Sequence, residues 1–159
     1  MKKYSKAYII RALSAGLLFA SFCSYAQQAP KPETLIKWRQ SAFQVIGWNA
    51  NRIKASIDGQ YNKEEVIKAA NIIAAISNGG LSNLFTPGTE QGKGWHDTAA
   101  KPELFKDSKH TNELFASLNK EANEFTKVVA IGDVASVKEQ YGKLTRTCKA
   151  CHDELKSKD

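Results

Sequence analysis

The sequence predicts an all-α protein folded as an antiparallel four-helix bundle. Apolar residues recur every three or four positions in four long segments, while strand-like alternation of useful length and internal repeats are absent. Most connections between these segments are short, which makes consecutive helices antiparallel neighbours. The 159 residues are 42% hydrophobic and 25% charged, which suits one domain with a sizeable core and excludes a disordered chain. Three cysteines are too few for a disulfide scaffold.

Residues 1–26 have the pattern of a cleaved export signal. Four basic residues precede an apolar stretch over residues 12–22, and Ser24 and Ala26 are small residues at the two positions that signal peptidase recognises. This stretch is about half the ~20 residues of a membrane-spanning helix, so a retained anchor is the less favoured alternative. Cleavage leaves residues 27–159 in the periplasm, with 19 basic and 16 acidic side chains. So small an excess does not indicate nucleic-acid binding.

The first two helices are predicted from their apolar periodicity and their ends. The first covers residues 33–58 and ends at Asp58-Gly59. Asn62, with Glu65 three residues later, predicts the N-cap of a second helix in a variant of the capping box, and Asn78-Gly79-Gly80 closes that helix. The apolar positions are Leu35, Ala42, Phe43, Ile46, Ala50, Ile53 and Ile57, then Val66, Ala69, Ala70, Ile73, Ala74 and Ile76.

Residues 81–107 interrupt the helical pattern with three glycines and two prolines. Phe85, Trp95, Leu104 and Phe105 nevertheless make this segment too apolar for a solvated linker. A loop of this length is uncommon in a compact domain and is usually functional or packed. We therefore expect it to lie over the end of the bundle.

The third helix is predicted over residues 108–131, and Gly132-Asp133 supplies its end and the N-cap of a fourth. The fourth helix has the most regular period, with alternating steps of three and four residues that indicate a seam facing the core. This seam consists of Val134, Val137, Tyr141, Leu144, Cys148, Cys151 and Leu155.

Cys148-Lys149-Ala150-Cys151-His152 is a C-x-x-C-H sequence, the attachment motif of c-type haem. Thiols at positions i and i+3 project from one helix face and can reach two vinyl groups of one porphyrin. We predict one haem c, covalently bound through Cys148 and Cys151, with His152 as the iron ligand. The alternatives are a redox C-x-x-C, a structural disulfide and half of a zinc site. A redox C-x-x-C normally follows a strand in an α/β pattern, which is not evident here. A zinc site would need two further ligands, and these are not evident either.

The opposite face of the iron has few candidate ligands. Met1 is the only methionine and lies in the predicted signal, so a methionine ligand is excluded. His96 and His110 are the only other histidines, and they lie in the loop and at a helix start, where surface roles are the alternative. Five-coordinate iron with an open side is therefore the leading expectation. Such iron binds small neutral ligands, whereas iron ligated on both sides mainly transfers electrons.

With this motif at the end of a helical bundle, the chain resembles the cytochrome c′ family, the class II c-type cytochromes. The resemblance covers nearly the whole mature chain and is most specific in the first helix and the haem motif. The matching segments are residues 31–33, 36–43, 87–90, 101–103 and 148–153.

The resemblance implies roles for five further residues. Arg39 and Gln40 are expected near the haem propionates, and Phe43 over the open face of the iron, with a surface role and plain core packing as their respective alternatives. Lys156 matches a basic residue near the proximal pocket, or is a solvated lysine at a helix end. Lys93 lies in the loop that approaches the haem edge in relatives, where a propionate contact is the expectation.

The function expected from the motif and the resemblance is an exported haem protein that binds nitric oxide or carbon monoxide and exchanges electrons with redox partner proteins. A plain periplasmic electron carrier is the main alternative, and a module without haem, built on Cys148 and Cys151, is the third. No enzyme activity, nucleic acid or membrane partner is expected. The resemblance also implies a homodimer through the first two helices, where Trp48 could contribute.

Overall fold

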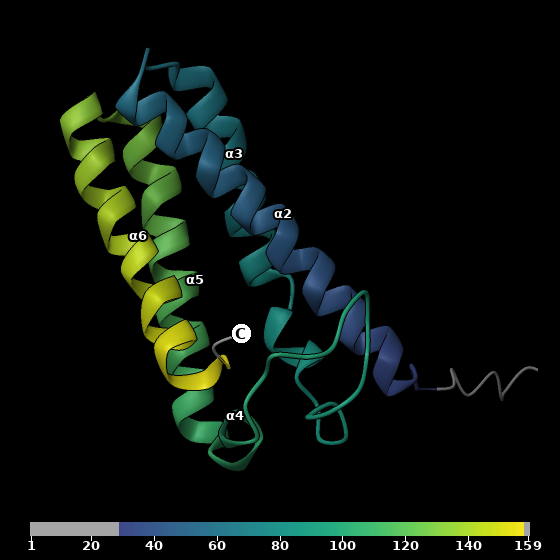
Figure 1. Cartoon of the computed structure of the whole chain (residues 1–159). Helices are drawn as coiled ribbons and strands as arrows, with labels where there is room; N and C mark the ends of the chain where they lie inside the picture. The colour runs from purple at the N-terminus through teal and green to yellow at the C-terminus, as the bar shows by residue number, and fades with distance from the viewer. Residues whose placement is uncertain (1–28, 158–159) are drawn as a thin grey trace, which may run out of the picture.

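The computed structural model describes residues 29–157 and confirms the predicted helical bundle (Figure 1). The predicted signal, residues 1–26, lies outside the described residues. The four long helices are α2 (Pro32–Asp58), α3 (Lys63–Asn78), α5 (Ser108–Ile131) and α6 (Val134–Leu155). Consecutive helices pack against each other, α2 on α3, α3 on α5 and α5 on α6. Among the described residues, no helix combines the length and the apolar character needed to cross a membrane.

Side-chain caps explain why three of the helices begin where the sequence predicts. The side chain of Asn62 accepts a hydrogen bond from the Glu65 amide at 3.2 Å, and that of Asp133 accepts one from the Ser136 amide at 2.8 Å. Asp107 caps α5 in the same way. One detail of the prediction is wrong. The carboxylate of Glu65 pairs with Arg52 on α2, so the capping box has only its Asn62 half.

The core lies between the helices and reaches the start of the long loop, where Leu81 is buried. Phe125 and Val129 of α5 are fully buried, as are Ile53 of α2 and Val137 of α6. Tyr141 of α6 donates a hydrogen bond to the Ala50 carbonyl of α2 at 2.8 Å, which links the first and the last of the four long helices.

Two predicted positions differ in the structure. Ile36, and not Leu35, is the buried apolar residue in the first turns of α2, because the inward stripe is shifted by one residue there. Val134, predicted in the α6 seam, is exposed at the first position of the helix. Leu144 and Leu155 of that seam are buried, and Cys148 and Cys151 are half-buried.

The long connection between α3 and α5 packs across the end of the bundle, as predicted. It contains a short 3-10 helix, η1 (Leu81–Leu84), and one turn of helix, α4 (Glu103–Lys106). Figure 1 shows α2 leaning away from α6 toward this end, with the connection running between them. Gly94 lets the loop approach α2 closely, since a Cβ there would lie 2.9 Å from the Lys37 amide nitrogen.

Candidate functional site

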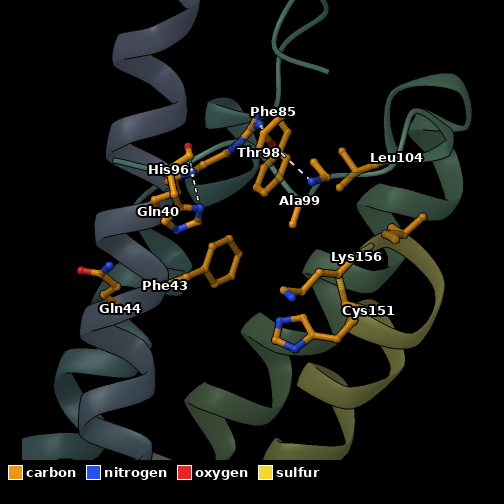
Figure 2. Close-up of a pocket in the computed structure, with 14 residues that line it drawn as sticks. Gln40, Phe43, Gln44, Phe85, His96, Thr98, Ala99, Leu104, Cys151 and Lys156 are labelled. Carbon is orange, nitrogen blue, oxygen red and sulfur yellow. Dashed lines mark hydrogen bonds between the residues drawn. The ribbon is translucent and has the colours of Figure 1, made fainter. Parts of the chain in front are cut away.

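A cavity of about 310 Å³ lies between α2, the long loop and the end of α6 (Figure 2). This volume is at the lower end of the range of about 300–1,000 Å³ that is typical of ligand sites. Three segments supply its walls. The lining residues are Arg39, Gln40, Phe43 and Gln44 from α2, Phe85, His96, Thr98, Ala99, Ala100 and Leu104 from the loop and α4, and Cys151, His152, Leu155 and Lys156 from the end of α6.

Cys148 and Cys151 lie one helical turn apart on α6 and are both free thiols. Cys148 packs against the core, whereas Cys151 lines the cavity. Burial raises the pKa of both thiols. A redox-active C-x-x-C normally has a thiol with a lowered pKa, so the electrostatics do not favour that alternative. Within residues 29–157, no group of three or more His, Cys, Asp or Glu side chains is arranged to hold a metal ion.

His152 follows Cys151 directly and lines the cavity with part of its surface, the rest being exposed. Desolvation lowers the pKa of His152, and the positive charge of Lys156 lowers it further. Both effects favour the neutral imidazole, which is the form that ligates metals.

The end of α6 is held in place by the loop. The Lys101 amide donates to the Leu155 carbonyl at 2.9 Å, and the Ser157 amide donates to the Ala99 carbonyl at 2.8 Å. The Lys101 side chain also donates to the Glu154 carbonyl at 2.8 Å, where a cation complements the helix dipole. These contacts fix the last turn of α6, and with it the position of His152.

Arg39 is only 3% exposed and fastens the loop to α2. Its guanidinium donates to the Thr89 hydroxyl at 2.8 Å, to the Thr89 carbonyl at 2.7 Å and to the Thr98 hydroxyl. It also lies over the Phe85 ring, 4.9 Å from the ring centre. All these partners are neutral, and burial lowers the pKa of Arg39 while Glu90 raises it. The cavity wall therefore contains a buried cation held by neutral groups.

Gln40 holds the tip of the loop against the same helix. Its amide nitrogen donates to the His96 carbonyl at 2.9 Å, and its amide oxygen accepts from the Trp95 backbone at 2.7 Å. The Nδ1 atom of His96 lies 2.8 Å from the Asp97 carbonyl oxygen. The Gln40 amide nitrogen also lies 3.3 Å from the same Nδ1, so the ring is held between the Gln40 side chain and the loop backbone.

Phe43 projects into the cavity from α2. Figure 2 shows Phe43 and His96 on the α2 side, facing Cys151 and Lys156 on the α6 side. The Phe43 ring packs edge-on against Phe85, with ring centres 6.1 Å apart. The α2 side is therefore apolar at its centre.

The structure brings most of the predicted site residues together around the cavity, whereas Cys148 lies one turn before it on α6, and Lys93 and His110 lie outside it. Lys93 is exposed, forms an isolated backbone bridge with Asp97 and does not line the cavity. His110, one of the two other histidines, lies at the start of α5, where its Nε2 is 2.6 Å from a Glu154 carboxylate oxygen.

Sequence reasoning missed part of the cavity wall. Phe85 and Leu104 were recognisable as loop residues too apolar for solvent, but nothing in the sequence assigned them, or Thr98, to this wall.

The donor set fits the haem that the C-x-x-C-H motif predicts. Haem combines an apolar ring, an iron that takes an imidazole ligand, vinyl groups that react with thiols, and two carboxylates. The cavity offers Cys151 and His152 on one side, with Cys148 one turn earlier on α6, and aromatic rings on the other. Its lining includes the cations Arg39 and Lys156 and no Asp or Glu. A buried cation with neutral partners is suited to an anionic group of this kind.

Comparison with known proteins agrees with this fit. The family model described as Cytochrome C′ matches residues 34–156. Cytochrome c′ of Rhodocyclus tenuis is 59% identical over 130 residues, covering 81% of this chain and 98% of that protein. Cytochrome c′ of Allochromatium vinosum is 35% identical over 152 residues, covering 95% of this chain and 99% of that protein.

Solved structures show the same fold. A cytochrome c′ described as having an unusual ligand-controlled dimer dissociation superimposes with a TM-score of 0.78 at 36% identity, covering 82% of this chain and 99% of that one. The nitric oxide complex of a variant cytochrome c prime from Alcaligenes xylosoxidans gives a TM-score of 0.73 at 25% identity, covering 83% of this chain and all of that one. With the family model, the relatives and the attachment cysteines in agreement, this chain belongs to the cytochrome c′ family and carries covalent haem c.

Proposed function

We propose that this protein is an exported cytochrome whose iron is ligated by His152 and open on the Phe43 side, and that it binds nitric oxide and carbon monoxide there while exchanging electrons with redox partner proteins. The observation that carries the proposal is the position of Phe43 on the cavity wall opposite the end of α6. Phenylalanine cannot ligate iron. The solved nitric oxide complex of the Alcaligenes xylosoxidans relative supports this choice of ligand.

The residues of the end of α6 hold the cofactor in this proposal. Cys148 and Cys151 form its two thioether bonds, and the neutral imidazole of His152 ligates its iron. The contacts of Lys101 with the last turn of α6 keep the imidazole oriented. Bound in this way, haem supplies an iron atom that changes oxidation state and accepts a diatomic ligand on its free side.

The α2 side and the loop recognise the rest of the group. Arg39, Gln40 and Lys156 line the cavity and supply the donors for the two haem carboxylates. Lys93 reaches these carboxylates only if its exposed side chain folds back toward the rim of the cavity. Arg39 already has its Thr89 and Thr98 partners, so its contribution is a fixed positive charge as much as a hydrogen bond.

Phe43 also determines which ligand is preferred. Bound oxygen requires hydrogen-bond donors and space, and the ring of Phe43 offers neither. Its edge contact with Phe85 limits the movement of the ring, so the wall stays crowded and apolar. Nitric oxide and carbon monoxide need no such donor and are therefore favoured over oxygen.

Replacement of Phe43 by alanine tests the proposal. The Phe43→Ala variant should bind carbon monoxide several-fold faster than the unaltered protein when both are reduced, measured by stopped-flow or flash photolysis. Phe105→Ala is the matched control, because Phe105 also packs near Phe85, at 6.4 Å, but does not line the cavity. Equal carbon monoxide association rates in the Phe43→Ala variant and the unaltered protein would remove Phe43 from the ligand site.

A plain electron carrier is the second candidate, and the observation in its favour is that His96 lines the same cavity. If His96 ligated the iron, the reduced protein would be low-spin and slow to bind carbon monoxide. An absorption spectrum of the reduced protein with and without carbon monoxide separates the two candidates.

A homodimer through α2 completes the proposal. Trp38, Val45 and Trp48 are exposed on one face of α2, with Trp48 59% exposed, and Arg52 stacks on the Trp48 ring. The spacing of Trp38, Val45 and Trp48 places them on one stripe of the helix. A dimer is the form that the related structure with ligand-controlled dissociation describes for that protein.

A further inference from the structure

We propose that the hydroxyl of Thr98 donates a hydrogen bond to one of the two haem carboxylates, and so connects the buried guanidinium of Arg39 to that group. The proposal rests on the haem position proposed above. It adds to the site a recognition residue that the sequence did not identify, and Arg39 then acts on this carboxylate chiefly through Thr98.

The first support is the use that the structure already makes of the Arg39 donors. A guanidinium has five N–H groups, two on each Nη and one on Nε. Nη1 donates to the Thr89 hydroxyl at 2.8 Å and to the Leu84 carbonyl at 3.5 Å, and Nη2 donates to the Thr89 carbonyl at 2.7 Å and to the Thr98 hydroxyl. Only the Nε–H is left for another acceptor. A carboxylate in the cavity therefore cannot be held by the two parallel N–H bonds that arginine often supplies.

The second support is the hydroxyl of Thr98, whose capacity to accept is full. A threonine hydroxyl has one O–H donor and two lone pairs. The Arg39 guanidinium and the Ala100 amide, the latter at 3.2 Å, both donate to this oxygen. The O–H group remains, and within residues 29–157 it has no acceptor. Because Thr98 lines the cavity, this remaining donor is available to a group bound there.

Thr89 provides the contrast. Its hydroxyl also accepts from Arg39, but it donates in turn to the Thr86 carbonyl at 2.8 Å, and Thr89 does not line the cavity. Two threonines thus accept from one guanidinium, and only Thr98 keeps a donor on the cavity side. A bonded cation polarises that donor and strengthens it. Hydrogen bonds to a carboxylate are also about twice as strong as those between neutral groups.

The third support is the charge around Thr98. The cavity lining contains the cations Arg39 and Lys156 and no Asp or Glu. Asp97 precedes Thr98 in the chain but is exposed and does not line the cavity. The charge of Glu90 acts on Arg39, but this carboxylate accepts from a loop amide at 2.8 Å and also lies outside the lining. The anionic groups that the proposed site brings to this wall are therefore the haem carboxylates.

The loop holds Thr98 in place before any group binds. Its amide donates to the Gly92 carbonyl at 3.0 Å, and the carbonyl of the next residue, Ala99, accepts from the Ser157 amide at 2.8 Å. Figure 2 shows Thr98 beside Phe85 on the loop side of the cavity. A hydroxyl that is already fixed loses little conformational freedom on binding, which favours recognition.

Resonance Raman spectra of the haem-loaded protein test the proposal, because the bending band of the haem carboxylates follows their hydrogen bonding. Thr98→Val preserves the shape and removes the hydroxyl, and it should move this band to lower frequency. Thr98→Ser keeps the hydroxyl and should restore the band of the unaltered protein. Thr89→Val is the matched control, because it removes an acceptor of Arg39 outside the cavity and should leave the band in place. An unchanged band in Thr98→Val, or an equal shift in Thr89→Val, would overturn the proposal.

NMR of the unaltered protein gives a second test that needs no variant. In the reduced carbon monoxide complex, which is diamagnetic, the side-chain protons of Thr98 should show a nuclear Overhauser effect to a propionate methylene of the haem. Absence of this effect would also overturn the proposal. If the reduced protein is low-spin and takes up no carbon monoxide, the open site of the proposed function fails. That form is diamagnetic too, so the same measurement still decides the role of Thr98.

Discussion

Replacement of Thr89 by valine probes how firmly the cavity wall depends on Arg39. Thr89 is 1% exposed, and its hydroxyl accepts from the Arg39 guanidinium at 2.8 Å while donating to the Thr86 carbonyl at 2.8 Å. Valine preserves the shape and removes both bonds. A hydrogen bond to a charged group contributes about 1.5–3 kcal/mol, and a buried charged donor left without its acceptor costs at least as much. The free energy of unfolding should therefore fall by about 2–3 kcal/mol.

Urea unfolding of the haem-loaded protein, followed by far-ultraviolet circular dichroism, measures this loss. At a slope of about 2 kcal/mol per molar, the midpoint should move by about 1 M. Two threonines serve as matched controls. Thr111→Val removes a buried bond to the neutral Leu104 carbonyl and should cost about 1 kcal/mol, and Thr126→Val removes an exposed bond and should cost under about 0.5 kcal/mol. If Thr89→Val costs no more than Thr126→Val, the guanidinium does not depend on this hydroxyl.

Two further predictions concern the N-cap of α6 and the exposed face of α2. The hydrogen bonds of Asp133 with Ser136 lower the pKa of the Asp133 carboxyl, so its stabilising effect is complete above the ordinary aspartate pKa and is lost as pH falls through the lowered value. Asp133→Ala should lower the urea midpoint at pH 7 but have less effect in acid, whereas Asp133→Asn should keep much of the cap; equal losses for Ala and Asn would contradict a capping role. Trp48→Glu should lower the sedimentation coefficient to that of a monomer. Trp95→Glu, which changes an exposed tryptophan of the loop, is the matched control and should leave the sedimentation coefficient unchanged. An unchanged dimer in Trp48→Glu would place the interface elsewhere.

The helices could be predicted because their signals are local. Asn62 and Asp133 begin α3 and α6 through bonds to amides three residues away, and the apolar periodicity of α5 and α6 identifies their buried faces. Where the local signal allowed two partners, the prediction was wrong. Glu65 pairs with Arg52 of the neighbouring helix and leaves the Asn62 amide to the Ser56 hydroxyl.

The haem motif could be predicted for the same reason, since Cys148, Cys151 and His152 are adjacent in sequence. The opposite wall could not, because it joins residues about fifty positions apart. Arg39 meets Thr89, and Gln40 meets His96, only after the loop has folded back on α2. No periodicity or spacing encodes that contact, so the sequence identified His96 only as a histidine in a loop.

The resonance Raman spectrum of the reduced protein, recorded with and without carbon monoxide, is the most direct test of iron ligated on one side only. We expect a high-spin, five-coordinate spectrum with an iron–histidine stretching band that disappears when carbon monoxide binds. A low-spin, six-coordinate spectrum of the reduced protein without added ligand would contradict the open site and, with it, the assignment of Phe43 to the ligand side.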